Sequence, residues 1–270
     1  MKDLFKRSLS AVVFLIIMIG ASLLGHLVFS LVFLPITIIG LYEYYKLLSS
    51  ETVRPARIIS IILGGIIYAL IAFGTPYLSS NYTFLFSFVL LLPLFFIELW
   101  RNKRNPLLNI AVSISGIFYV SFPLAMLSNF FLHSTSETNG YPLVLGYLFI
   151  LWLNDTGAYF VGSAMGKNRL FERHSPKKSW EGSIGGGLFA VLMAYGNSLL
   201  FPELEFWKWI IIAIIVIFAG TLGDLVESML KRSVGVKDSG NIMPGHGGIL
   251  DRFDAVLLSA PFVYIVLLLI

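Results

Sequence analysis

The feature that constrains this chain most is a succession of apolar runs of sixteen or more residues, separated by short polar stretches. A helix that crosses the hydrocarbon core of a bilayer needs about 20 predominantly apolar residues, which is close to the length of these runs. Charged residues make up only 13% of the chain, whereas a soluble domain carries about 25%. A water-soluble globule is therefore excluded. The sequence predicts an all-α, polytopic integral membrane protein.

The apolar runs predict about nine transmembrane helices. They cover residues 9–25, 27–45, 58–78, 82–99, 107–132, 141–163, 183–201, 206–223 and 253–270. The first run follows three basic residues, as the core of a signal peptide does, but further spans follow it in place of a cleavage site and a soluble domain, so we interpret it as the first span. We expect an N-terminal part, residues 1–135, with spans one to five. A C-terminal part, residues 136–270, would carry spans six to nine and long catalytic loops.

The distribution of basic residues predicts the orientation in the membrane. With the N-terminus in the cytoplasm, eighteen of the 19 Lys and Arg residues fall on the cytoplasmic side and Lys208 alone falls outside. Cytoplasmic loops are enriched in Lys and Arg, so the N-terminus is predicted inside and the C-terminus outside. The net charge of +4 then reflects membrane orientation, and no nucleic-acid partner is expected. The absence of cysteine excludes disulfides, thiolate metal sites and thiol nucleophiles.

Several carboxylates lie inside or at the edge of the predicted spans, where each costs on the order of 3 kcal/mol and is a functional candidate. Four aspartates reach the cytoplasmic side of spans six, eight and nine: Asp155, Asp224, Asp251 and Asp254. Glu43 and Glu98 end other spans at the same side. They have no acidic companions nearby in the sequence, and we expect them to snorkel or to pair with a cation.

The spacing of these acids indicates a shared site. Asp224, Glu227 and Lys231 occupy one helical face if the eighth span continues past residue 223, and Asp251 and Asp254 share another. Clustered carboxylates at a low-dielectric boundary are tolerable when a cation lies between them. An all-oxygen donor set favours Mg²⁺ over Zn²⁺. A simpler interpretation stays open, in which Glu227 pairs with Lys231 and Asp251 caps the last helix.

Cations and glycines surround the acids in two long cytoplasmic loops, 164–182 and 224–252. The second loop contains Lys231, Arg232 and Lys237, followed by Asp238-Ser-Gly240 and Pro244-Gly-His-Gly-Gly248. The first contains Ser175-Pro-Lys-Lys-Ser-Trp-Glu-Gly182. Glycine-rich backbone can approach a phosphate closely while Lys and Arg offset its charge. His246 could be a metal ligand, a phosphate donor, a general acid or a plain turn residue.

Small residues at the start of the seventh span form a weaker pattern. Gly182-Ser-Ile-Gly-Gly-Gly187 loosely resembles a phosphate loop, and Gly162 and Gly166 stand four residues apart. Small residues in spans more often permit close helix packing. We favour packing for both.

One stretch carries a family resemblance. Ser228-Met-Leu-Lys-Arg-Ser-Val-Gly-Val-Lys-Asp-Ser-Gly-Asn-Ile-Met-Pro-Gly-His-Gly-Gly-Ile-Leu-Asp-Arg-Phe-Asp254 resembles the signature of phosphatidate cytidylyltransferases, the CDP-diacylglycerol synthases. Its Lys-Arg, Lys-Asp, His-Gly-Gly and Asp-Arg-x-Asp elements match at the family's spacing. Asn154-Asp-Thr-Gly-Ala-Tyr-Phe160 and 175–181 also resemble family segments. The first five spans match only in hydrophobic character.

The resemblance implies the reaction of CTP with phosphatidate to give CDP-diacylglycerol and pyrophosphate, with a divalent metal. Phosphatidate already presents an anionic oxygen, so no side chain need act as a base. We expect Asp224, Asp251, Asp254 and Glu227 to hold Mg²⁺, with room for a second cation. Asp224, Asp251, Lys231 and Lys237 are the expected catalytic residues. Substrate binding is expected from Lys177, Lys178, Arg232, Asp238, His246, Gly247, Gly248 and Asp155. The resemblance also favours a homodimer, in the plasma (inner) membrane, with a cytoplasmic active site.

Two other functions use similar residues. An ion-coupled transporter also needs embedded carboxylates, but its acids tend to lie near the midplane rather than beside phosphate-binding residues at one edge. A CDP-alcohol phosphotransferase also handles Mg²⁺ and a CDP-lipid. Its signature DGxxAR…GxxxDxxxD is absent from this sequence.

Overall fold

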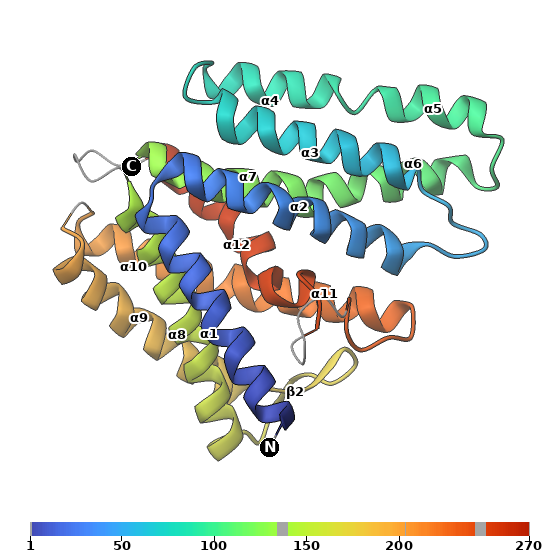
Figure 1. The fold of residues 1–270 in the computed structure, drawn as a ribbon. Helices are drawn as coiled ribbons and strands as arrows, with labels where there is room; N and C mark the ends of the chain where they lie inside the picture. The colour runs from blue at the N-terminus through green and yellow to red at the C-terminus, as the bar shows by residue number, and fades with distance from the viewer. Residues whose placement is uncertain (1, 134–139, 203, 241–246, 270) are drawn as a thin grey trace. The chain divides into compact units, whose positions relative to one another are not determined.

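The structure is a computed structural model that describes residues 2–133, 140–202, 204–240 and 247–269. Within these ranges it consists of helices and one short two-stranded sheet, which confirms the all-α prediction (Figure 1). The chain divides into two compact units. The first comprises Met1–Asn129 and Val234–Phe253, and the second comprises Phe130–Ser233 and Asp254–Ile270.

The first unit contains the N-terminal helices. They are α1 (Lys2–Leu23), α2 (His26–Leu48), α3 (Arg57–Gly74), α4 (Ser80–Val89), α5 (Pro93–Arg101), α6 (Pro106–Gly116), the π-helical η1 (Ile117–Ser121) and α7 (Phe122–Ser128). Buried tyrosines tie them together: the Tyr45 hydroxyl donates to the Ser113 carbonyl at 2.5 Å, and the hydroxyls of Tyr68 and Ser128 lie 2.8 Å apart. These two buried tyrosine hydroxyls therefore have partners on neighbouring helices, which offsets the cost of a polar group in a low-dielectric interior.

The second unit contains the C-terminal helices and the sheet. Its helices are α8 (Tyr141–Met165), α9 (Trp180–Leu200), α10 (Phe206–Ile215), the π-helical η3 (Val216–Gly220), α11 (Thr221–Ser233) and most of α12 (Leu250–Leu269). The 3-10 turn η2 (Asn129–His133) joins the units in sequence. Strands β1 (Arg169–Phe171) and β2 (Ser175–Ser179) pair antiparallel as a hairpin in the predicted loop 164–182.

Eight helical stretches within the described residues are long and apolar enough to cross a membrane. They begin at His26, Arg57, Asn81, Pro106, Tyr141, Trp180, Phe206 and Leu250. These match predicted spans two to nine. Helix α1 covers the first predicted span, but its described apolar part, Ser8–Leu23, is shorter than the others.

Some helix ends differ from the predicted spans. The third span ends at Gly74 rather than residue 78, and the eighth continues as one helical stretch from Phe206 to Ser233. The extension beyond residue 223 is polar and has an amphipathic pattern, so a prediction from hydropathy alone ends where the apolar run ends.

Glycines bring α8 and α9 close together. A Cβ atom on Gly186 would meet the Asn154 carbonyl oxygen at 2.5 Å, and one on Gly157 would meet the Phe189 ring at 2.7 Å. A Cβ atom on Gly162 would lie 3.4 Å from the Cα atom of Gly182. The packing interpretation of the glycine run 182–187 is therefore confirmed, because backbone approaches backbone where side chains are missing.

We predict that Gly186→Ala destabilises the second unit, because the added methyl group collides with backbone rather than with a flexible side chain. Overpacking of this kind costs roughly 1–3 kcal/mol. The control is Gly187→Ala, whose Cβ would meet the Ile217 side chain at ordinary contact distances, the nearest atom being Cδ1 at 3.5 Å. Thermal unfolding in detergent should show a lower transition temperature for Gly186→Ala alone. Equal transitions for the two variants would contradict the packing.

Candidate active site

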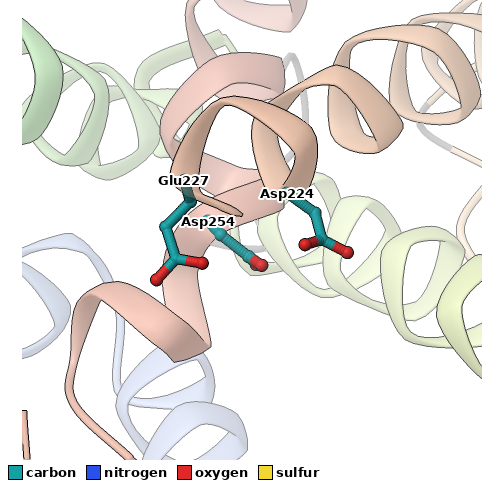
Figure 2. Close-up of side chains that lie close together, drawn as sticks. All are labelled: Asp224, Glu227 and Asp254. Atoms are coloured by element: carbon teal, nitrogen blue, oxygen red, sulfur yellow. The ribbon is translucent and has the colours of Figure 1, made fainter. Parts of the chain in front are cut away.

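Three carboxylates of the second unit lie together. Asp224 and Glu227 come from α11 and Asp254 from α12, and each offers an oxygen within 4.8 Å of the others (Figure 2). Two oxygens on opposite sides of an octahedral Mg²⁺ are about 4.2 Å apart, twice the usual ligand distance. Among the described residues, this group has the oxygen donors that a hard divalent cation prefers, within 4.8 Å of one another. We call it the acidic cluster.

A glycine allows the acidic cluster to form. Gly223 lies against the backbone of α12, where a Cβ atom would collide with the Asp254 carbonyl oxygen and approach Ala255 Cα to 3.2 Å. A Cβ atom on Gly220, one turn earlier, would lie 3.6 Å from Ala255 Cβ. This close approach places Asp224, the residue after Gly223, beside Asp254. Residues thirty positions apart in the sequence therefore contribute to one cluster.

Two lysines neutralise part of the charge. Lys178 Nζ lies 2.6 Å from Asp224 Oδ2, and Lys231 Nζ lies 2.5 Å from Glu227 Oε2. The Ser228 hydroxyl donates to Asp224 Oδ1 at 3.3 Å. Glu227 thus pairs with Lys231, as the simpler interpretation has it, and also belongs to the acidic cluster, while its role as a metal ligand stays a prediction. Its side chain is only 2% exposed, so a partner is needed to offset its burial.

The hairpin brings Lys178 to Asp224. Glu181, at the start of α9, accepts hydrogen bonds from the backbone N–H groups of Lys167 and Asn168, at 3.1 and 3.2 Å. Ser179 caps α9 by accepting from Gly182 N at 3.1 Å. Glu181 and Ser179 therefore anchor the hairpin where the chain enters it and where the chain leaves it. The sequence placed Lys178 in a loop and did not predict the strands.

Asp155 faces the same charges from α8. Its carboxylate interacts electrostatically with Lys178 and Asp224. Asp155 also interacts with Asp254. Asn154 Nδ2 contacts Asp155 Oδ1 at 3.5 Å. The structure thus brings Asp155, Lys178, Asp224 and Asp254 into one electrostatic neighbourhood, contributed by α8, β2, α11 and α12.

Asp251 has a different environment, within the first unit. Its Oδ2 atom accepts hydrogen bonds from Ser239 N and Ser239 Oγ, both at 2.9 Å, and from Gly248 N at 2.7 Å. Asp251 stands in the first turn of α12. It therefore organises the loop ahead of the helix. Its predicted role as a metal ligand stays a prediction.

Glu43 has contacts near Asp251 that sequence reasoning did not predict. It is 2% exposed in α2, so it does not snorkel. Its Oε2 atom accepts from Leu250 N at 3.0 Å and lies 3.3 Å from Ser239 Oγ. Glu98, by contrast, pairs as predicted, with Arg101 at 2.5 Å. The companions of Glu43 are about two hundred residues away in the sequence, so no local pattern could have revealed them.

The remaining residues that the sequence predicts for the site are exposed or lie in loops. Lys177 is exposed on β2, Arg232 is exposed at the end of α11, and Lys237 and Asp238 are exposed in the loop that follows. Gly247 has φ of +82°, a conformation that favours glycine, and Gly248 is close to Glu43. His246 lies outside the described residues.

Comparison with known proteins agrees with this arrangement. A sequence model described as the cytidylyltransferase family matches residues 5–270. A phosphatidate cytidylyltransferase of Haemophilus influenzae is 40% identical over 166 residues, which cover 59% of this chain and 57% of that protein. Those of Staphylococcus aureus (strain COL) and Staphylococcus epidermidis (strain RP62A) are 35% and 33% identical, and each alignment covers 97% of this chain and 98% of the relative. The resemblance of residues 228–254 is confirmed, and the chain belongs to the cytidylyltransferase family.

Proposed function

We propose that this chain transfers the cytidylyl group of CTP to phosphatidate, giving CDP-diacylglycerol and pyrophosphate for phospholipid biosynthesis. The observation that carries the proposal is the acidic cluster with Lys178 and Lys231 already bonded to two of its members. Carboxylates beside lysines suit a substrate that brings both a metal and phosphate groups. The family's full-length relatives bear the name of this activity.

Asp224, Glu227 and Asp254 would hold Mg²⁺, and Asp251 is proposed as a further ligand. Bound there, Mg²⁺ would screen the negative charge of the phosphates and polarise the bonds to the reacting phosphorus. The ammonium groups of Lys178 and Lys231, which now lie on carboxylates, would then be available for phosphate oxygens. A second cation and a homodimer stay predictions.

The reaction requires the protein to align charged groups but not to transfer a proton. An anionic oxygen of phosphatidate forms a bond to the α-phosphorus of CTP, and the bond from that phosphorus to the bridging oxygen of pyrophosphate breaks. Lys231, Arg232, Lys237, Lys177 and Lys178 would bind the triphosphate and stabilise the departing pyrophosphate. Asp155, close to Lys178, would orient that lysine. No general base is required.

The direct experiment is incubation of the purified protein with labelled CTP, Mg²⁺ and phosphatidate. Formation of a labelled CDP-lipid with release of pyrophosphate is the expected result. A transporter would give neither product, and a CDP-alcohol phosphotransferase would consume a CDP-lipid instead of forming one from CTP.

We predict that Asp224→Asn and Asp254→Asn each reduce CDP-lipid formation by more than about a hundredfold, because each removes a charged ligand from the acidic cluster. Titration of product formation against Mg²⁺ should show a raised metal requirement or no activity. The matched control is Glu172→Gln, an exposed acid in the turn of the hairpin, which should stay within about twofold of the parent. Near-normal activity of either aspartate variant would remove that residue from the metal site.

Lysine variants test the nucleotide site. Lys178→Ala and Lys237→Ala are each expected to raise the KM for CTP about tenfold or more, since a charge-assisted hydrogen bond to phosphate is lost. The KM for phosphatidate should change less in Lys237→Ala. Unchanged CTP dependence would mean that these lysines serve only to orient the protein in the membrane.

The proposed cytoplasmic active site requires the predicted orientation. Because the chain has no cysteine, single cysteines can be labelled one at a time in intact bacterial cells. Lys103→Cys, after the fourth predicted span, should react with a membrane-impermeant maleimide only after the cells are opened. Tyr77→Cys, 89% exposed after the third span, should react in intact cells. The reverse pattern would overturn the orientation.

A further inference from the structure

Glu43 belongs to a second polar group, and the proposed chemistry gives Glu43 itself no role. The group lies in the first unit and consists of Glu43 in α2, Ser239 in the loop after α11, and Asp251 at the start of α12. Glu43 and Ser239 are 2% and 7% exposed. A carboxylate buried in a membrane-spanning helix is costly, so its position calls for a functional explanation.

The contacts of Glu43 and Asp251 join the two ends of one segment. Glu43 Oε2 accepts from Leu250 N at 3.0 Å and lies 3.3 Å from the Ser239 hydroxyl. Asp251 Oδ2 binds Ser239 N, Ser239 Oγ and Gly248 N, at 2.9, 2.9 and 2.7 Å. Ser239 and residues 248–250 are therefore bound to the same two carboxylates, although they stand nine or more positions apart in the sequence.

The position of the Glu43 side chain explains why residues 240 and 248 of this segment are glycines. A Cβ atom on Gly240 would collide with the Glu43 Oε1 atom and approach its Cδ to 2.8 Å. A Cβ atom on Gly248 would collide with Glu43 Oε2 and with the Ser239 hydroxyl. The backbone of the segment thus closes around the carboxylate of α2, and only glycine leaves room for it at these two positions.

The hydrogen-bond pattern indicates which property of the Glu43 side chain the segment requires. A serine hydroxyl has one hydrogen and can donate to one acceptor at a time. The Ser239 hydroxyl lies closer to Asp251 than to Glu43, at 2.9 Å against 3.3 Å. Leu250 N is therefore the donor that Glu43 does not share with Asp251. A glutamine would keep one acceptor oxygen in the place of Oε2, the atom at which Glu43 meets both Leu250 N and Ser239 Oγ. We therefore expect the segment to need an acceptor oxygen at residue 43 rather than a negative charge.

We propose that Glu43 is a positioning residue for CTP binding. It fixes Ser239-Gly240 and Gly248–Leu250 against α2, and so sets the places of Lys237 and Asp238 before the segment and of Gly247 within it. This inference rests on the proposed function, in which Lys237 binds the triphosphate and Asp238 and Gly247 are predicted substrate-binding residues. Glu43 itself does not touch the reacting atoms. The specific consequence is that its loss weakens CTP binding and leaves phosphatidate binding nearly unchanged.

The first experiment compares Glu43→Leu with Glu43→Gln. The leucine variant should raise the KM for CTP about tenfold or more, with the KM for phosphatidate within about twofold, and the glutamine variant should restore most of the CTP affinity. Glu98→Leu and Glu98→Gln are the matched controls, because Glu98 is also a buried glutamate of the first unit but bonds to Arg101 and Asn109. Equal effects on both substrates, or no effect of Glu43→Leu on CTP, would overturn the proposal.

A double-variant cycle covers the case in which Glu43→Leu does not fold. Gly240→Ala should raise the KM for CTP in the parent, because its methyl group displaces the Glu43 carboxylate. In a Glu43→Ala background the space is free, so Gly240→Ala should add less than about a twofold further change. Additive effects would show that Gly240 and Glu43 act independently, which contradicts the proposal.

Hydrogen exchange separates this proposal from the proposed function. Amides of Ser239, Gly248 and Leu250 should exchange faster in Glu43→Gln than in the parent by only a small factor, and about tenfold or more faster in Glu43→Ala. This measurement needs no CTP and no turnover. A parent protein that makes no CDP-lipid would refute the proposed function, whereas unchanged exchange in Glu43→Ala would refute the role of Glu43.

Discussion

The cost of holding carboxylates in apolar helices governs the arrangement of this protein. Five buried or half-buried acids have a donor or a cation against them: Lys231 on Glu227, Lys178 on Asp224, Arg101 on Glu98, and backbone N–H groups on Glu43 and Asp251. Without such partners each would carry a large desolvation penalty. The lysines, the hairpin and the loop before α12 can all be understood as means of supplying these partners.

Close backbone approach is the second requirement, and glycine provides it in both units. Gly223 lets α11 lie on α12 at Asp254, and Gly186 lets α9 lie on α8 at Asn154. Gly240 and Gly248 let a loop close around Glu43. Glycine thus allows the helices to pack closely, the acidic cluster to form and loop residues to approach Glu43. In each case a side chain would occupy the space that a partner's backbone or carboxylate needs.

Local patterns predicted a large part of the fold and of the site. The span lengths, the shared face of Asp224, Glu227 and Lys231, and the packing role of the glycines near residue 185 depend on contacts within a few residues or on composition. Prediction from these patterns was less complete where partners are distant. Sequence reasoning did not find the strands around Lys178, and it assigned Glu43 no companions because Ser239 and Leu250 lie about two hundred residues away.

The sequence by itself determined that the chain is a helical membrane protein, which residues carry its charge, and the family to which it belongs. These follow from hydrophobic run lengths and from an ordered motif, both of which are properties of the linear chain. Only the tertiary structure decided which acids share a cluster and which organise a loop. Asp251 and Asp254 are three residues apart on one helix, yet one accepts hydrogen bonds from a loop while the other joins Asp224 and Glu227. That division depends on which backbone approaches each side chain, and helix periodicity does not contain this information.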